Sequence, residues 1–485
     1  MEELNPNVVA KRSIKGVFAF VSRSTFVSAV NLVRDITLQI LLSPAVFGIY
    51  AVVESFITIL QYFSDIGLAG ALIQKKEQIT QDELKTTFTI QSLLVLGLVI
   101  IILLFSNSIG AFFHFPKEAI VLLQAFAISF FLSSLKTIPS IILERNLEFG
   151  KFVIPQMVET IFYTCTVIFF ALRGFGITSF TYAVLARGVS GLVAMYIICP
   201  WRVRFGFSKD TLSHLLSFGV PYQANSILAL LKDNLIILFL GRMLPYTQVG
   251  YIAFAQKWAF FPLRLVMDNI IRVTFSSFSR LQHDKKALGF AFEKSVLAGT
   301  SLIFPSLVGL ITLAPHIMHL FPQYQQKWEA AYISLLFFAA NAALASVLVP
   351  STNLLNAIGK IKITLCFMIG WTLFIWIATP IGISLFGFNS FAAITAVINV
   401  SVIPIVFIAK KYLDFKIFNS IKGPLFASFF LWVLLFFVSP FAVKNMFTLV
   451  AMVILGGALY VGLLIFIAKE EMLADLKFIR ENLRK

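Results

Sequence analysis

The chain has 485 residues, of which 59% are hydrophobic and only 13% are charged, and its formal net charge is +16. This apolar excess excludes an ordinary soluble globular protein. The positive charge is better explained by cytoplasmic loops of a membrane protein than by nucleic-acid binding. The three cysteines show no CxxC or Cys/His spacing, so the sequence predicts neither a disulfide framework nor a metal site.

Long stretches without charge recur along the chain and predict membrane-spanning helices, because about 20 apolar residues cross a bilayer as a helix. Pro and Gly residues, as at Ser43-Pro44, mark several boundaries between them. The sequence therefore predicts an all-α, polytopic membrane protein. The fourteen expected spans are 14–42, 46–73, 87–113, 118–142, 153–173, 178–199, 213–241, 247–276, 288–315, 329–357, 362–385, 389–409, 423–443 and 446–468.

The distribution of Lys and Arg over the loops predicts the orientation of the chain. With a cytoplasmic N-terminus, 25 of these residues fall in inside segments and 5 in outside segments. Cytoplasmic loops of membrane proteins carry such an excess, so we expect a multi-pass protein of the cytoplasmic membrane with both termini inside. The tail at 469–485 mixes apolar and charged residues, which predicts an amphipathic helix on the cytoplasmic surface.

Two parts of the chain share a pattern of polar residues within apolar segments. Arg34-Asp35 in the first expected helix matches Lys232-Asp233 in the seventh, and each pair precedes a break and a glycine. The second and eighth helices carry polar residues at equal spacing, which are Glu54, Gln61 and Asp65, and Lys257, Arg264 and Asp268. Such repeats are typical of transporters whose substrate site lies between two halves. We predict pseudo-symmetric six-helix lobes at 10–200 and 210–410 around a central cavity, two peripheral helices within 423–468, and the tail.

Basic residues at membrane depth are the candidate substrate-binding residues. A charge at the bilayer centre costs about 2.5–3.5 kcal/mol or more, so it normally faces a polar interior and serves a function. Arg binds phosphate through two parallel hydrogen bonds and Lys acts as a point charge, which predicts an anionic cargo. The candidates are Arg23, Arg34, Lys232, Lys257 and Arg264.

Acidic residues in the same helices are candidates for coupling transport to protons or sodium ions, with structural pairing to bases as the alternative. These candidates are Asp35, Glu54, Asp65, Asp233 and Asp268. Four further bases lie close to expected helix ends, so we expect them to extend toward the lipid headgroups. They are Lys136, Arg187, Arg272 and Lys294.

Motifs of nucleotide hydrolysis and of common hydrolases are missing from the chain. It has no GxxxxGK[ST] P-loop, no GxSxG and no HExxH. A polysaccharide polymerase or glycosyltransferase would need a substantial outer loop to hold sugars, and the expected outer loops are short. The sequence therefore predicts a transporter rather than an enzyme, with no cofactor.

Short segments in a fixed order resemble those of bacterial polysaccharide exporters. They are Leu42-Ser43-Pro44-Ala45-Val46-Phe47-Gly48-Ile49-Tyr50, Phe63-Ser64-Asp65-Ile66-Gly67-Leu68, Leu143-Glu144-Arg145-Asn146-Leu147-Glu148-Phe149, Gly174-Phe175-Gly176 and Leu354-Leu355-Asn356-Ala357-Ile358-Gly359. Over residues 10–410 the chain is similar to the O-antigen (Wzx-like) flippases of the multidrug/oligosaccharidyl-lipid/polysaccharide (MOP) exporter superfamily.

This resemblance implies a cavity that opens alternately to each side of the bacterial inner membrane. It implies as cargo an undecaprenyl-diphosphate-linked oligosaccharide repeat unit for lipopolysaccharide or exopolysaccharide, moved by a proton or sodium gradient. The implied partners are this lipid-linked cargo, membrane lipids, and the polymerase and glycosyltransferases of the pathway. A drug or organic-cation antiporter and a peptidoglycan-precursor flippase of the same fold remain the alternatives.

Overall fold

The computed structural model describes residues 6–64, 68–75, 77–209, 211–212 and 234–482. Over these ranges the regular structure is helical, without a β-strand. Eleven of the described helices are long and apolar enough to cross a membrane. The predicted all-α membrane fold is confirmed. The expected seventh span at 213–241 lies largely outside the described residues, so the number fourteen stays a prediction.

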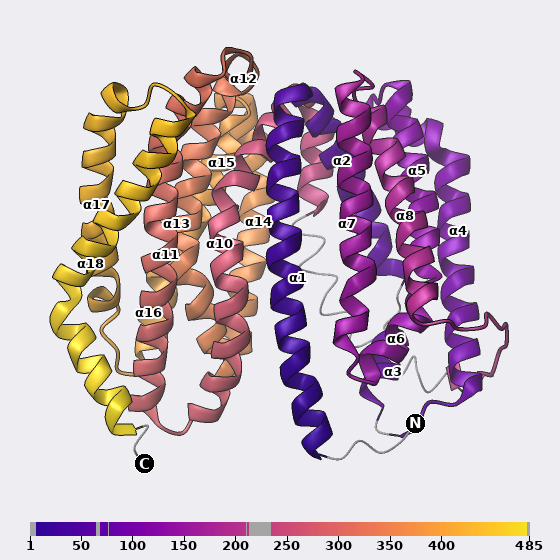
Figure 1. The fold of residues 1–485 in the computed structure, drawn as a ribbon, viewed down its shortest axis with the longest axis horizontal. Helices are drawn as coiled ribbons and strands as arrows, with labels where there is room; N and C mark the ends of the chain where they lie inside the picture. The colour runs from indigo at the N-terminus through magenta and orange to yellow at the C-terminus, as the bar shows by residue number, and fades with distance from the viewer. Residues whose placement is uncertain (1–5, 65–67, 76, 210, 213–233, 483–485) are drawn as a thin grey trace. The chain divides into compact units, whose positions relative to one another are not determined.

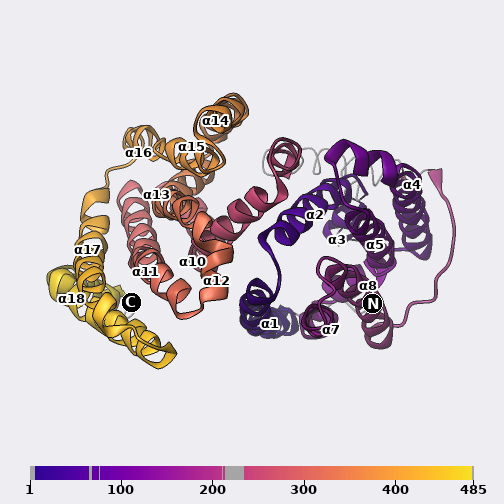
Figure 2. The ribbon, with the colours of Figure 1, turned by 90° about the horizontal axis from the view of Figure 1, so that it is seen from above.

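The chain divides into two compact units, Met1–Gly250 and Tyr251–Lys485. In the first unit, α7 packs against α1 and α8, and α5 packs against α4 and α8 (Figures 1 and 2). The helices of this unit are α1 (Pro6–Leu41), α2 (Pro44–Ser64), α3 (Leu68–Gln74), α4 (Gln81–Phe113), α5 (Lys117–Ser134), α6 (Thr137–Arg145), α7 (Phe149–Leu172) and α8 (Thr178–Ile198).

One apolar core joins six helices of the first unit. Its buried residues include Leu38 of α1, Val53 of α2, Val95 of α4, Leu122 of α5, Val167 of α7 and Ala183 of α8. Because lipid tails are as apolar as these side chains, close van der Waals packing between the helices, rather than removal from water, stabilises this core. The predicted lobe boundary between residues 200 and 210 falls within this unit and stays a prediction.

In the second unit, α11 contacts both α13 and α17, and α17 in turn packs against α18 (Figure 2). The helices are α10 (Tyr246–Leu281), which starts in the first unit, α11 (Lys285–Leu320), α12 (Pro322–Trp328), α13 (Tyr332–Ala357), α14 (Ile361–Phe386), α15 (Asn389–Asn399), α16 (Val402–Lys410), α17 (Ile417–Ala442) and α18 (Met446–Asn482). The expected separate tail helix is part of α18, which continues without a break to Asn482.

Two expected helices are each broken in the structure, and a proline explains both breaks. The segment expected at 118–142 forms α5 and α6, with a turn at Leu135 and Lys136. The segment expected at 389–409 forms α15 and α16 around Val400 and Ser401. A proline cannot donate to the carbonyl four residues earlier and its ring collides with that carbonyl. Pro139 lies four residues after Leu135, and Pro404 lies four residues after Val400.

Two glycines allow backbone contact between the first turns of α2 and α10. A Cβ on Gly48 would overlap the carbonyl oxygen of Tyr246, and a Cβ on Gly250 would overlap that of Pro44. These are the glycines that follow the matched charge pairs of the predicted repeat.

Replacing Gly48 by alanine is expected to destabilise the protein by about 1–3 kcal/mol, because the added Cβ has only backbone to displace. Thermal unfolding in detergent measures the effect. Gly97 in the middle of α4 has open space at its Cβ position, so Gly97→Ala is the matched control. Equal melting temperatures for the two variants would contradict the close contact.

Candidate functional site: a cationic cavity in the first unit

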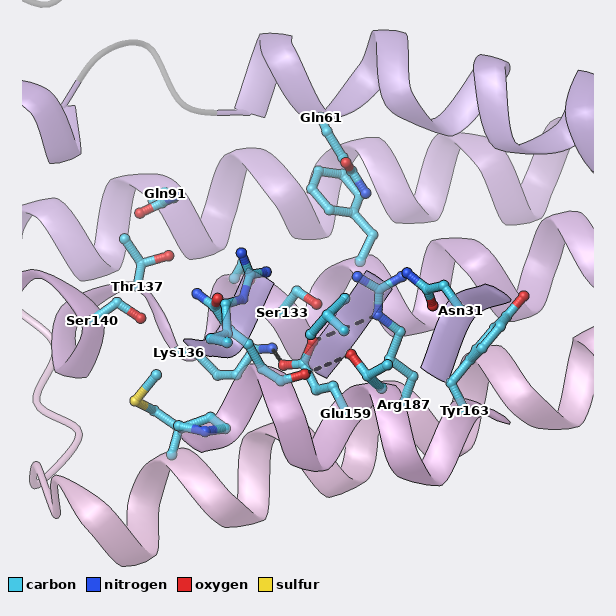
Figure 3. Close-up of a pocket in the computed structure, with 18 of the residues that line it drawn as sticks. Asn31, Gln61, Gln91, Ser133, Lys136, Thr137, Ser140, Glu159, Tyr163 and Arg187 are labelled. Carbon is cyan, nitrogen blue, oxygen red and sulfur yellow. Dashed lines mark hydrogen bonds and ion pairs between the residues drawn. The ribbon is translucent and has the colours of Figure 1, made fainter. Parts of the chain in front are cut away.

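A polar cavity of about 570 Å³ lies within the first unit, enclosed by residues from α1, α2, α4, α5, α6, α7 and α8. Four of its lining side chains are basic, and one is acidic; they are Arg23, Arg34, Lys136, Arg187 and Glu159. Most other lining residues carry neutral polar groups, among them Asn31, Gln61, Ser133, Thr137 and Ser140 (Figure 3). The name cationic cavity is used for this space below.

Helix α1 brings Arg23 and Arg34 to the same wall of the cavity. The two residues are eleven positions apart, which is close to three helical turns, so they share one face. Asp35 holds Arg34 in place by accepting hydrogen bonds from Nε at 3.0 Å and from Nη2 at 2.8 Å. The Arg34 guanidinium also lies 5.2 Å from the ring centre of Tyr163 on α7.

Arg23 has a different environment from Arg34. Its Nε atom is buried and has no hydrogen-bond partner among the residues that the structure describes. A buried donor left without a partner costs about 1–3 kcal/mol, and more when the group is charged. Arg23 is therefore the cavity base best placed to receive an anion from outside the protein.

Glu159 on α7 lies between two further bases of the cavity, Lys136 and Arg187 (Figure 3). Lys136 Nζ donates a hydrogen bond to Glu159 Oε1, and Arg187 Nε lies 3.5 Å from Glu159 Oε2. The turn that precedes α6 places Lys136 at this point, so the break caused by Pro139 helps to build the site. The absence of a Cβ at Gly191 of α8 makes room for the carboxylate, which fills that position.

The charges of the cavity do not balance. The lining bases number four, and two of their charges are offset by Asp35 and Glu159. A surplus of positive charge around a cavity among spanning helices is costly unless water or an anion compensates it. The arrangement therefore favours a negatively charged ligand that also offers groups for neutral hydrogen-bond partners.

The structure brings together some of the predicted site residues and leaves others elsewhere. Arg23, Arg34 and Gln61 line the cationic cavity. Glu54 lies on α2, where it accepts a hydrogen bond of 3.3 Å from the hydroxyl of Tyr50. Three other candidates are exposed on α10 in the second unit; they are Lys257, Arg264 and Asp268. The candidates Asp65, Lys232 and Asp233 lie outside the described residues.

Three residues of the site were not assigned to it from the sequence. Lys136 and Arg187 were expected to extend toward the lipid headgroups, but both line the cavity. Glu159 lines it too and forms ion pairs with both bases. Two signals were present: an acidic residue within the apolar stretch 153–173, and Pro139 within an expected helix. Among the described residues, no group of three or more His, Cys, Asp or Glu side chains is placed to hold a metal ion.

Spanning helices around a polar cavity define a membrane transporter, and comparisons with known proteins agree. Residues 38–333 match the family described as polysaccharide biosynthesis protein, and the chain belongs to this family. The predicted resemblance to polysaccharide exporters of the MOP superfamily is thereby confirmed, as is the prediction of a transporter rather than an enzyme.

Two relatives illustrate the family. The lipopolysaccharide biosynthesis protein WzxC of Escherichia coli (strain K12) is 26% identical over 362 residues, which are 74% of this chain and 72% of WzxC. The succinoglycan biosynthesis transport protein ExoT of Rhizobium meliloti (strain 1021) is 24% identical over 328 residues, 67% of this chain and 66% of ExoT. The chain is thus a multi-pass bacterial membrane protein.

Solved structures show the same fold. The lipid II flippase MurJ in an inward closed conformation aligns with a TM-score of 0.74 at 17% identity, covering 93% of this chain and 99% of MurJ. An inward-facing multidrug resistance MATE family transporter of the MOP superfamily aligns with a TM-score of 0.61 at 15% identity, covering 78% of this chain and 93% of that transporter.

Proposed function

We propose that the protein flips undecaprenyl-diphosphate-linked oligosaccharide repeat units across the bacterial inner membrane by alternating access, for the synthesis of a surface polysaccharide. The diphosphate headgroup rests in the cationic cavity during this movement. The observation that carries the proposal is the surplus of basic over acidic side chains in a polar cavity within spanning helices.

The side chains of the cavity suit both parts of such a headgroup. A single guanidinium, such as that of Arg23 or Arg34, binds two phosphate oxygens through parallel hydrogen bonds, and Lys136 supplies a point charge. Neutral groups near the junction of α5 and α6 offer hydrogen bonds to sugar hydroxyls; they are Ser133, Ser134, Thr137 and Ser140.

The basic surplus argues against a drug or organic-cation antiporter, because a cation would be repelled from the cavity. A peptidoglycan precursor carries the same lipid diphosphate, and the fold match to the lipid II flippase MurJ concerns the fold alone. Membership in the polysaccharide biosynthesis protein family favours the repeat unit as cargo.

Transport against a gradient of lipid-linked cargo needs an energy source, and the proposal includes coupling to protons or sodium ions. Among the described candidates, Asp35 is held by Arg34. Glu54, which accepts a hydrogen bond from Tyr50, and Asp268 are exposed and are the remaining candidates. Flipping in proteoliposomes, measured after dissipating first the proton gradient and then the sodium gradient, identifies the ion; unchanged flipping under both treatments contradicts coupling.

Replacing Arg23 by alanine is expected to weaken cargo binding about 10- to 100-fold, because a hydrogen bond to a charged group contributes about 1.5–3 kcal/mol and each 1.4 kcal/mol is tenfold. Flipping of a polyprenyl diphosphate oligosaccharide in proteoliposomes measures the loss. Folding is expected to stay intact, because no described residue loses a hydrogen bond from Arg23 Nε when this side chain is removed.

The control for this substitution is Arg173→Ala. Arg173 follows α7, is exposed, and lies 4.2 Å from the ring centre of Phe169 outside the cavity. Wild-type flipping by Arg23→Ala, or an equal loss in both variants, would contradict a role of the cavity in binding the headgroup.

A further inference from the structure

A second hollow of about 530 Å³ lies in the first unit between α4, α5 and α8. The same helices also line the cationic cavity, but neighbouring residues along the chain line different spaces. Gln91, Ser134 and Met195 line the cationic cavity, whereas Ser92, Leu135 and Tyr196 line the second hollow. The two spaces are therefore separated by a wall of helices.

The lining of this second hollow is almost entirely apolar, and we call it the apolar groove. It includes Leu93, Leu96 and Val193, whose side chains are exposed. The hydroxyl of Tyr196 is already used, because it donates to the carbonyl of Leu135 at 3.1 Å. The hydroxyl of Ser92 is buried and has no hydrogen-bond partner in the described part of the chain. A ligand of this groove must be one that needs almost no hydrogen bonds.

A segment without regular structure, residues 199–208, forms one side of the apolar groove; we call it the strap. It leaves the end of α8 and passes α4 (Figures 1 and 2). The backbone N–H of Gly206 donates to Thr89 Oγ1 at 3.1 Å, and that of Ser208 donates to Thr86 Oγ1 at 3.2 Å. These bonds fix the strap to α4.

The strap has an apolar and a basic side. In an extended chain successive side chains point in opposite directions. Val203 and Phe205 line the groove, and the ring of Phe205 lies 5.8 Å from that of Phe88. Arg202 and Arg204 alternate with them and are exposed. The strap therefore carries two exposed bases directly beside the apolar residues that line the groove.

We propose that the apolar groove and the strap bind an anionic membrane phospholipid, with an acyl chain in the groove and the phosphate at Arg202 and Arg204. A hydrocarbon chain matches the apolar lining. Basic residues beside spanning helices attract anionic headgroups, with about 1 kcal/mol per Lys or Arg near the surface. The strap lies in a segment that the loop charges place on the cytoplasmic side, where such lipids are the natural ligands.

The polyprenyl chain of the cargo is a poorer match for this site. Its diphosphate belongs in the cationic cavity, and the wall formed by α4, α5 and α8 separates that cavity from the groove. The phospholipid site does not depend on the proposed function, because its charges belong to the strap and its lining belongs to another face of these helices.

Trp201 reports on this site, since its ring lies 5.1 Å from that of Phe88 in the groove wall. The experiment uses the full chain in proteoliposomes that contain brominated phosphatidylglycerol or brominated phosphatidylcholine at equal mole fraction. The difference between wild type and Trp201→Phe isolates the fluorescence of Trp201. Brominated phosphatidylglycerol is expected to quench it at least twofold more strongly, and the Arg202→Ala/Arg204→Ala double variant is expected to lose this preference.

Two controls make the outcome decisive. Trp432 on α17 is exposed among apolar residues, so its quenching, isolated with Trp432→Phe, is expected to be equal for both lipids. Salt at high concentration is expected to reduce the preference at Trp201, because exposed charges are screened. Equal quenching of Trp201 by both lipids, or a preference that survives the double variant, would overturn the proposal.

Discussion

Replacing Arg34 by alanine is expected to cause the largest loss of both stability and transport. The Arg34–Asp35 pair is largely buried, with 17% and 9% of the two side chains exposed. Removing one partner of such a pair costs about 3–5 kcal/mol, because the other charge stays buried. The same substitution removes a base from the cationic cavity. Thermal unfolding in detergent and flipping in proteoliposomes measure the two effects separately.

The Arg34→Ala/Asp35→Asn double variant distinguishes the two roles. Neutralising Asp35 removes the buried charge, so the melting temperature is expected to recover most of its loss. Flipping is expected to stay low, because the phosphate-binding base is still missing. Recovery of both properties in the double variant would show that Arg34 only neutralises Asp35 and does not bind cargo.

Replacing Glu159 by glutamine is expected to tighten the binding of a diphosphate and to slow transport. Glu159 forms ion pairs with Lys136 and Arg187, so an incoming anion must compete with this carboxylate for the two bases. The neutral amide removes the competitor, and a gain of about 1.4 kcal/mol would correspond to tenfold tighter binding. Release then becomes slower, since no internal anion replaces the phosphate.

Titration with inorganic pyrophosphate gives the affinity of the Glu159→Gln variant, and flipping at saturating cargo gives its turnover. Glu159→Asp keeps the charge and is the matched control, with an affinity expected near that of wild type. Weaker pyrophosphate binding by Glu159→Gln than by wild type would mean that Glu159 supports the anion site through structure alone.

The features that follow from local sequence could be predicted. The apolar stretches gave the helices and the fold class, since the length of a span is set by the bilayer. Their position at membrane depth singled out Arg23 and Arg34 as candidate binding residues, and both line the cavity. A resemblance spread over many short segments identified the family, which the match over 38–333 confirms.

The side of the cavity formed by Lys136, Glu159 and Arg187 depends on tertiary contacts that residue spacing alone does not reveal. Lys136 was expected within a single helix, close to its end. Because of Pro139, α5 ends at Ser134, and Lys136 lies in the turn before α6, where it contacts Glu159 of α7. The slot for Glu159 exists only because Gly191 of the neighbouring helix lacks a side chain. Such pairings between helices need the packing of α7 against α8, which the sequence pattern does not specify.

The central claim is that the cationic cavity binds a lipid diphosphate, and equilibrium binding to the purified full chain tests it most directly. Farnesyl diphosphate and farnesol share one hydrocarbon chain and differ in the headgroup. We predict that farnesyl diphosphate binds, that inorganic pyrophosphate displaces it, and that Arg23→Ala weakens it at least tenfold, while farnesol binds weakly to both proteins. Equal affinity for farnesol and farnesyl diphosphate, or an unchanged affinity in Arg23→Ala, would contradict the account.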